Sequence, residues 1–525
     1  MLIDAAQLPD GSSIESSIAI IGGGMAGLTM ASELARAGKS VCILESGSQR
    51  PESADGRRLH LKTQDLLKGT ASLAAPDAER EIDEYLVSSR LRAIGGAGNL
   101  WGGKCAPLDP MDFADRSWIP NSGWPFNRRD LASYYDRACD VLKMPHFDFD
   151  LAMPREPDRP PLTVNGNTNF TTVSRQHTNV TGAADTSDFA AFRDAVLEHA
   201  QVRVYANANV TNIALNLEGT AVERVEVACL NGKRHVATAR QYLLATGGIE
   251  NARLLLSSNG VHTGGIGNQH DLVGRFFSGH VTYGDWKGTE GANTAVFFSR
   301  LNQSFDLYAS RDRSKVWGIL ATSSDAQRRE QLPNFTVTFF PLNFEPPGVS
   351  QTIASLARCS DDPDWTGTGS ARAVVDGHYF PAYFMCEQLS HPESRVTLTS
   401  ERDELGMRRV NLRWRFDKTD FDGLERSIRF LRKDLGSDSS GRVEWPVERS
   451  RLLEIMRTSR HHIGTTRMHA NPRFGVVDTQ CRVHGVANLY VAGSSVFPTG
   501  GIANPTLTIL ALAIRLTDHF QTLEG

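Results

Sequence analysis

The chain has 525 residues, of which 40% are hydrophobic, so it is long enough to bury a large core in about two to four structural units. Its formal net charge of −4 gives no electrostatic reason to expect nucleic acid or an anionic membrane surface as a partner. Small-molecule chemistry is therefore the class of function that the composition favours.

Seven cysteines are scattered through the sequence without C-x-x-C spacing, and this odd number fits reduced thiols better than a disulfide framework. The first residues lack a basic stretch followed by an apolar run, so no secretory signal is expected. The apolar run at 502–516 contains Asn504, Pro505 and Arg515 and falls short of a membrane span. We therefore expect a cytoplasmic protein with no membrane partner.

Residues 18–47 predict a strand, a tight turn, a helix and a second strand, because apolar residues occur first in a short run and then at helical spacing. This order is one βαβ unit. Residues 51–90 are polar with weak helical periodicity, and the glycine-dense stretch 93–104 follows. Segment 151–187 is rich in Pro, Asn and Thr and predicts an excursion over the surface or toward a cleft.

The α/β rhythm resumes from 188 to about 260, with a helix, two strands and a further strand-to-helix turn. Alternating short strands dominate 280–415, a pattern that favours antiparallel sheet. The tail from 418 is rich in helical pattern and closes with a strand and an apolar helix. The sequence thus predicts a discontinuous nucleotide-binding domain of α/β type into which a β-rich domain is inserted.

The first chemical motif is Gly22-x-Gly24-x-x-Gly27, which joins the first predicted strand to the first predicted helix. Glycines are needed in such a turn because backbone N–H groups at the helix start must approach a pyrophosphate without a Cβ in the way. Glu45 ends the next strand, where a carboxylate accepts hydrogen bonds from ribose hydroxyls. A structural glycine turn can mimic the bare motif, but strand, helix and acid together predict a dinucleotide site, with NAD and FAD both open.

A second glycine-rich segment, 95–103, is too dense in glycine for ordinary helix or strand, because glycine loses more entropy on ordering than any other residue. A flexible loop is the alternative, but Trp101 within the segment favours ordered packing, with something approaching the backbone closely. A further turn, 245–250, follows a predicted strand and opens a helix. We expect this second strand-to-helix edge to touch the same cofactor.

Several segments, spread from residue 18 to 516, jointly resemble the glucose–methanol–choline (GMC) oxidoreductases: IAIIGGGMAGL, GGAGNLWGG, LLATGGIENARLLL, HHIGTTRMH and GGIANPTLTILALAIRL. The final block is most similar to the branch of pyranose oxidases and bacterial sugar and polyol dehydrogenases. The resemblance implies an α/β fold, with a Rossmann-type FAD-binding domain and an inserted substrate domain of antiparallel sheet and helices. It divides the chain into FAD-binding parts at 1–150, 188–278 and 456–525, an excursion or lid-like segment at 151–187, and a substrate-binding domain at 279–455.

The resemblance implies noncovalent FAD as the cofactor, because Leu100 stands where pyranose oxidases carry the histidine that is bonded to the flavin. It implies no metal, since the clustered cysteines that hold an iron–sulfur cluster in some related sugar dehydrogenases have no counterpart in this sequence. The residues expected to bind FAD are Gly22, Gly24, Met25, Ala26, Gly27, Glu45, Ser46, Gly95, Gly96, Asn99, Leu100, Trp101, Gly102, Val210, Ala245, Thr246, Gly247, Gly493, Ser494, Asn504, Pro505 and Thr506.

Oxidation of an alcohol requires a base for the hydroxyl proton as the hydride leaves carbon, and a neutral imidazole within hydrogen-bond reach suits this task. By resemblance to the family, His461, three residues before Gly464, is the catalytic base. Asn504 occupies the position of a second polar group, which donates to the substrate oxygen and cannot compete for the proton. His462 is the alternative base; adjacent residues of an extended segment point to opposite faces, so only one of the two histidines is expected to face the flavin.

The helix that follows Asn504 is predicted to begin at Pro505, whose missing N–H would be unpaired in a first turn. Free N–H groups at Thr506 and Leu507 then form a partial positive charge. Placed against the N1/O2 edge of the flavin, this helix start would stabilise the negative charge that arrives with the hydride. An ordinary Pro-started amphipathic helix is the structural alternative.

The resulting hypothesis is FAD-dependent oxidation of a secondary or primary alcohol on a sugar, glycoside or cyclitol. His461 takes the proton, the hydride passes to flavin N5, and oxygen or a quinone-type acceptor reoxidises the cofactor. The alternative is an FAD-containing lyase of the hydroxynitrile lyase type, in which the flavin takes no part in redox chemistry. An NAD-dependent dehydrogenase is a weaker alternative, because several glycine segments are spread along the chain.

Overall fold

The computed structural model of the chain describes residues 1–48, 68–73, 79–81, 89–144, 146, 166, 168–177, 188–283, 295–298, 308–309, 315–339, 378–416, 418–437, 441–444 and 457–523. Most of the predicted excursion, 151–187, and most of 51–90 lie outside these residues. Within the described ranges, no helix combines the length and the apolar character that crossing a membrane requires. Six cysteines lie in the described part of the chain, and all six are buried.

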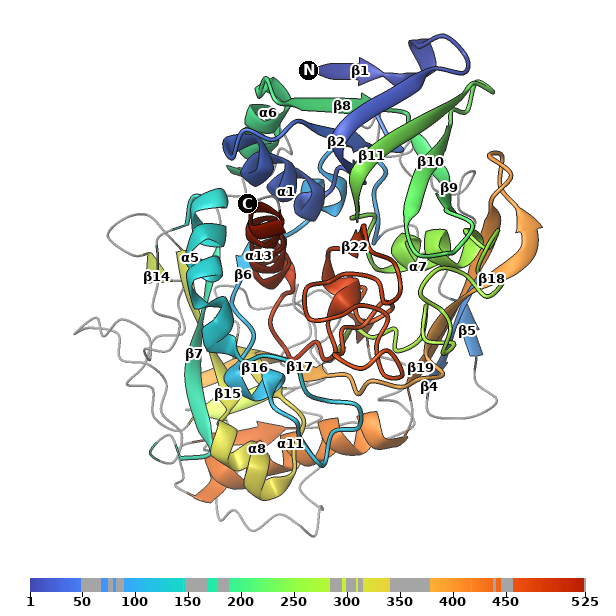
Figure 1. Cartoon of the computed structure of the whole chain (residues 1–525). Helices are drawn as coiled ribbons and strands as arrows, with labels where there is room; N and C mark the ends of the chain where they lie inside the picture. Colours follow the sequence, from blue (N-terminus) through green and yellow to red (C-terminus); the bar gives the residue numbers. More distant parts are fainter. Residues whose placement is uncertain are drawn as a thin grey trace.

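An eight-stranded sheet carries the predicted nucleotide-binding unit and lies at the top of Figure 1. Its strands are β1 (Leu2–Asp4), β2 (Ser13–Ile21), β3 (Val41–Leu44), β8 (Val202–Ala206), β9 (Asn209–Leu215), β10 (Val222–Ala228), β11 (Arg234–Leu244) and β22 (Leu489–Val491). Seven of them run in the spatial order β1, β8, β3, β2, β11, β10, β9, and β22 pairs with β11. Parallel pairing joins β1, β8, β3, β2, β11 and β22, whereas β9, β10 and β11 form an antiparallel meander.

Helices pack against this sheet or against one another beside it. They are α1 (Met25–Arg36), α5 (Ala132–Val141), α6 (Asp188–Glu198), α7 (Gly248–Ser257) and α13 (Thr506–Leu523). α13 contacts both α1 and α5 and stands at the centre of Figure 1. Because most of α13 is buried between these neighbours, its sequence is apolar almost without interruption. All four residues of β3 are buried, as expected for a parallel strand that is covered on both faces.

A ten-stranded sheet forms the second layer, at the lower left of Figure 1. Its strands are β6 (Lys104–Cys105), β7 (Phe170–His177), β12 (His280–Tyr283), β13 (Ala295–Phe298), β14 (Tyr308–Ala309), β15 (Lys315–Thr322), β16 (Phe335–Phe339), β17 (His378–Glu387), β20 (Gly441–Glu444) and β21 (Arg457–Thr458). All its pairs are antiparallel. β7 belongs to the segment predicted as an excursion, so this part of that segment is a strand of the second sheet.

The remaining elements flank these two layers. Helices α8 (Ser324–Glu330) and α11 (Lys418–Ser437) lie beneath the second sheet in Figure 1. A four-stranded sheet contains β18 (Arg395–Arg402), β19 (Arg408–Phe416), β4 (Lys68–Leu73) and β5 (Glu79–Glu81). Short turns of helix are α4 (Pro110–Phe113), η1 (Ala5–Gln7), η2 (Gly96–Asn99), η3 (Arg128–Leu131) and η5 (Ser494–Val496). The predicted fold class, a Rossmann-type α/β domain with an inserted unit of antiparallel sheet and helices, is confirmed.

Candidate active site

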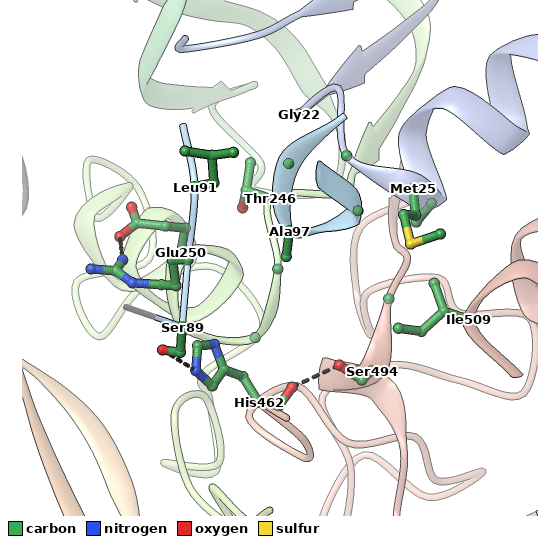
Figure 2. Close-up of a pocket in the computed structure, with 18 of the residues that line it drawn as sticks. Gly22, Met25, Ser89, Leu91, Ala97, Thr246, Glu250, His462, Ser494 and Ile509 are labelled. Atoms are coloured by element: carbon green, nitrogen blue, oxygen red, sulfur yellow. Dashed lines mark hydrogen bonds and ion pairs between the residues drawn. The ribbon is translucent and has the colours of Figure 1, made fainter. Parts of the chain in front are cut away.

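A cavity of about 840 Å³ is lined by residues of both large sheets and of the segments between them. Its lining includes Glu45 of the nucleotide-binding unit and Tyr383 and Met385 of β17. Part of its wall is shown in Figure 2, with Met25 and Ile509 on one side and Ser89 and Glu250 on the other. A cavity of this size is typical of a site for a cofactor or a small molecule.

The glycines of the first turn serve two different purposes. Gly22 has a φ of 103°, and a Cβ there would lie 2.6 Å from the carbonyl oxygen of Ala245. A Cβ on Gly27 would lie 2.0 Å from the carbonyl oxygen of Gly22, so this glycine permits close packing of α1 on β2 and does not itself line the cavity. Gly24 does line it, and a Cβ there would meet no atom within 4 Å. Gly24 therefore leaves room for a ligand to approach the start of α1.

The carboxylate of Glu45 is fixed at the end of β3 and lines the cavity. Its oxygens accept hydrogen bonds from the backbone N–H groups of Gly23 (2.7 Å) and Gly47 (2.8 Å) and from the hydroxyl of Ser46 (3.2 Å). Burial raises the pKa of Glu45, and these hydrogen bonds oppose that effect. Because each carboxylate oxygen can accept two hydrogen bonds, capacity remains for ribose hydroxyls.

The second glycine segment lies directly beside the first. Gly95 forms a parallel bridge with Gly24, and its N–H donates to the carbonyl oxygen of Gly23 at 2.7 Å. The side-chain nitrogen of Asn99 donates to the carbonyl oxygens of Ile94 and Gly96, each at 3.0 Å. These bonds make the segment an ordered turn. Gly95 and Asn99 hold it from outside the cavity wall, whereas Gly96, Leu100, Trp101 and Gly102 form part of that wall.

The other predicted cofactor residues also meet at this cavity. Its wall includes Ala26, Ser46, Val210, Ala245, Thr246, Gly247, Gly493, Ser494, Asn504, Pro505 and Thr506. Gly247 and Gly493 have φ values of 88° and 105°, and a Cβ on either would meet no atom within 4 Å. The carbonyl oxygen of Pro505 accepts from the N–H of Ile509 at 2.8 Å, which is the first intrahelical bond of α13. The N-terminal end of α13 is therefore directed at the cavity.

His461 and His462 both line the cavity, and the reason is a break in strand pairing. Ser459 donates to the carbonyl oxygen of His280 at 3.1 Å, and Ile463 pairs with Ser278. Three residues, 460–462, thus lie opposite the single residue 279. This bulge removes the regular alternation from which we expected only one of the two histidines to face the flavin.

The two imidazoles have different partners. Nε2 of His462 lies 3.0 Å from the hydroxyl of Ser89, as Figure 2 shows, and its ring packs against Phe277 with centroids 5.6 Å apart. Nδ1 of His461 lies 3.0 Å from Nδ1 of His280, with the two rings edge to face. His462 is thus bonded through Nε2, whereas the contact between His461 and His280 involves Nδ1 of His461.

Both histidines are held neutral. Burial lowers the pKa of His461 well below 6.5, and the adjacent imidazoles of His280 and His462 lower it further. Burial and the nearby guanidinium of Arg90 lower the pKa of His462 to about 3. At neutral pH, His461 is therefore an uncharged imidazole, the form that can accept a proton.

Several residues in or behind the cavity wall belong to no motif in the sequence. Ser89 and His280, the partners of the two histidines, are distant from them in sequence. Ile319, Thr338, Tyr383 and Met385 supply the wall from the second sheet. In the fold, a Cβ on Gly248 would lie 2.6 Å from the Cβ of His462, so the second glycine of the turn after β11 makes room for that side chain.

Comparison with known proteins agrees with this geometry. Residues 390–513 match the family model of GMC oxidoreductases, and residues 20–50 match that of NAD(P)-binding Rossmann-like domains. The chain is 25% identical to paromamine 6′-oxidase of Streptomyces fradiae, with 95% of this chain and 90% of the relative covered. It is 21% identical to 2-methyl-1,2-propanediol dehydrogenase of Mycolicibacterium austroafricanum, over 97% of this chain and 95% of the relative. A solved formate oxidase from Aspergillus oryzae RIB40 shares the fold, with a TM-score of 0.58, 18% identity and coverage of 98% and 99%.

A dinucleotide-binding fold whose cavity brings together two glycine turns and a neutral histidine fits a flavin-dependent oxidoreductase. Residues 390–513 carry the C-terminal domain of the GMC oxidoreductases, as the motifs of the chain indicated. The protein is an enzyme that oxidises CH–OH groups with FAD as its cofactor. Four residues of the cavity wall fit this cofactor. Gly24, Gly247 and Gly493 leave space for it, and Pro505 lies at the start of α13.

The linkage to the flavin can be tested directly. Leu100 lines the cavity at the position where a covalent link would require a histidine, and a leucine side chain has no nucleophile. We expect acid precipitation to release yellow flavin into the supernatant, measured by its absorbance. Flavin that stays with the pellet after washing in denaturant would show a covalent bond.

Proposed function

We propose that the enzyme oxidises a primary or secondary alcohol on a sugar, glycoside or cyclitol, with His461 as the base and Asn504 as a hydrogen-bond donor. The observation that carries the proposal is that a neutral His461 and Asn504 line the same cavity as the glycine turns. FAD, held at Gly24, Gly247 and the start of α13, would supply the acceptor for the hydride of the carbinol carbon. The roles of the protein are to bind the alcohol, to remove its proton and to exclude water from the site.

His461 is suited to proton removal. Its Nδ1 is occupied by the contact with His280, so Nε2 is the nitrogen that faces a substrate hydroxyl. A positioned general base of this kind accelerates a reaction by roughly 10²- to 10⁴-fold. The low pKa of His461 keeps the imidazole in its basic form throughout the neutral range.

Asn504 and the start of α13 act beside the base. The amide of Asn504 can donate a hydrogen bond to the substrate oxygen and does not titrate. The backbone N–H groups at the start of α13 add a partial positive charge, worth about 0.3–1 kcal/mol at a surface and up to ~2 kcal/mol in a partly buried site. Both favour negative charge in this part of the cavity as the substrate loses its proton.

The second sheet supplies a wall suited to a polyhydroxylated ring. Tyr383 and Thr338 bring hydroxyl groups, and Ile319 and Met385 bring apolar surface. Tyr383 is anchored by a hydrogen bond to Thr282, and burial raises its pKa, so the phenol stays protonated. Such alternation of apolar and hydrogen-bonding groups is typical of pockets that orient a ligand by a few polar contacts. The relative that oxidises paromamine supports a sugar-like substrate.

The proposal is tested by mixing the FAD-loaded enzyme anaerobically with a panel of sugars, glycosides and cyclitols. Bleaching of the flavin absorbance by one of them supports alcohol oxidation. Cleavage of a substrate while the flavin stays oxidised supports the lyase instead. Admission of air then distinguishes an oxidase, which recolours rapidly, from an enzyme that needs a quinone-type acceptor.

Asn504→Ala should slow flavin reduction less than loss of the base does. Removing one hydrogen bond to a developing charge costs about 1.5–3 kcal/mol, or roughly 10- to 150-fold in rate. The measurement is stopped-flow reduction under anaerobic conditions, with the FAD-to-protein ratio as the control. Asn504→Asp, which keeps the shape but brings a negative charge, should be at least as slow; an unchanged rate in both variants would remove Asn504 from the mechanism.

The pH dependence of flavin reduction follows from the state of His461. A base works in its unprotonated form, so the rate should fall as the pH drops through the pKa of His461. Because burial lowers that pKa, the acid limb should lie below the ordinary histidine value of 6.5. A limb at or above 6.5 in the rate of reduction would contradict a buried neutral base.

A further inference from the structure

His280 is the residue that contacts His461 from the second sheet, and its backbone is held firmly. It begins β12, and its side chain has no exposed surface. Its N–H donates to the hydroxyl of Ser459 at 2.9 Å, and its carbonyl oxygen accepts from the N–H of Ser459 at 3.1 Å. The ring of His280 is therefore presented to His461 by two backbone contacts immediately before the bulge.

The two ring nitrogens of His280 meet different partners. Nε2 lies 3.5 Å from the carbonyl oxygen of Gly500, and Nδ1 lies 3.0 Å from Nδ1 of His461. A carbonyl oxygen can only accept, so Nε2 of His280 carries the proton of that contact. A neutral imidazole has one N–H, so with that proton on Nε2 the Nδ1 of His280 is an acceptor.

This assignment determines the state of His461. A hydrogen bond between two Nδ1 atoms contains one proton, and His280 has none to give at that position. The proton therefore sits on Nδ1 of His461, and the lone pair of its neutral ring sits on Nε2. A cationic His280, or a neutral His280 with its proton on Nδ1, would donate in this contact. Nδ1 of His461 would then be the acceptor, and the proton of a neutral His461 would sit on Nε2, where it would block proton removal.

We propose that His280 is a positioning residue that keeps His461 in the Nδ1–H tautomer, so that Nε2 receives the substrate proton. This inference rests on the proposed role of His461 as the base. When Nε2 takes the proton from the substrate hydroxyl, the ring becomes a cation and its Nδ1–H still donates to His280. A charge-assisted hydrogen bond is stronger than a neutral one, so the pair also stabilises the state after proton transfer.

His280 also connects the base to the loop that precedes Asn504. Gly500, its Nε2 partner, follows Thr499, whose hydroxyl donates to the backbone oxygen of Asp112 at 2.7 Å. A Cβ on Gly500 would lie 2.8 Å from a methyl group of Ile463. The segment is thus packed tightly, and one imidazole touches both the base and the backbone that leads to Asn504.

Three substitutions at His280 separate this role from packing. Asn offers an oxygen close to the position of Nδ1, Leu has nearly the same size with no acceptor, and Asp offers a charged acceptor. We expect His280→Leu to slow anaerobic flavin reduction by roughly 10- to 100-fold, and His280→Asn to stay within about tenfold of the wild type. Melting temperature and the FAD-to-protein ratio are compared for all three, so that a loss of folding is recognised.

His280→Asp should change the pH profile in a way that packing cannot. Among the described residues, the imidazoles of His280 and His462 act on the pKa of His461, and the guanidinium of Arg90 acts on the pKa of His462. A carboxylate at 280 would stabilise the protonated form of His461, so the acid limb of flavin reduction should move to higher pH. An unmoved limb in a folded, FAD-loaded His280→Asp variant would contradict the contact.

The tautomer itself is measured by NMR of FAD-loaded protein with ¹⁵N-labelled histidine, with His461→Gln used to assign the signals of His461. We expect a protonated Nδ1 and a bare Nε2 at neutral pH, and in His280→Leu a new population with a protonated Nε2. A protonated Nε2 in the wild type would overturn the inference, as would His280→Leu with wild-type rate, pH profile and tautomer. Should His461→Ala retain normal reduction, the proposed base is wrong, and the NMR result still decides whether His280 selects the tautomer.

Discussion

Replacing His461 with alanine should slow reduction of the flavin by roughly 10²- to 10⁴-fold while FAD stays bound. The imidazole of His461 is neutral, and its contact with His280 is made by Nδ1, which leaves Nε2 to take the proton. Nε2 of the neighbouring His462 is instead in contact with the hydroxyl of Ser89. Alanine at position 461 offers no group that could take the proton. The alanine variant should fold, because His461 belongs to a bulge and not to a regular strand. Stopped-flow absorbance under anaerobic conditions measures the rate.

His462→Ala is the matched control, since it removes the neighbouring imidazole from the same cavity wall. We expect a smaller effect, because Nε2 of His462 is occupied by the hydroxyl of Ser89 and its ring packs on Phe277. A reversed order, with His461→Ala nearly normal and His462→Ala inactive, would assign the base to His462.

Gly24→Val should abolish FAD binding without unfolding the protein. Gly24 has a φ of −76°, which valine can adopt, and a Cβ there would meet no protein atom within 4 Å. The added side chain would instead point into the cavity at the start of α1, where the pyrophosphate of a dinucleotide approaches. Absorbance of the purified protein should show almost no flavin, and circular dichroism should show a folded chain.

Gly260→Val is the control for this prediction. Gly260 is exposed, lies away from the cavity wall, and a Cβ there would also meet no atom within 4 Å. It should bind FAD normally and melt near the wild-type temperature. If Gly24→Val purified with a full complement of flavin, the cofactor would not approach the first glycine turn as we infer.

The parts of the site that are local in sequence could be predicted from it. The first glycine turn, Glu45 and the helix after Pro505 each depend on a few adjacent residues, because turn geometry, strand ends and helix starts are set locally. All three lie at the cavity. Gly27, Gly95 and Asn99 were also predicted as cofactor residues, and in the fold they support the turns from behind.

The partners of the two histidines could not be predicted. His280 and Ser89 are brought to the site by strand pairing and by the path of the chain across it, and no spacing rule relates them to His461 and His462. The alternation argument also failed at this place, because a bulge depends on the register of β12 with β21, which the sequence of one strand does not reveal. The wall formed by Thr338 and Tyr383 has the same origin, since cross-strand neighbours depend on sheet order.

A crystal structure of the FAD-loaded protein is the most direct test of the account. It should show the flavin ring beside His461, with Nε2 facing the ring across a gap that admits one carbinol group, and with the adenosine end at Glu45. An electron-density map that placed the flavin ring away from residue 461, or that turned Nε2 of this imidazole out of the cavity, would contradict the assignment of the base.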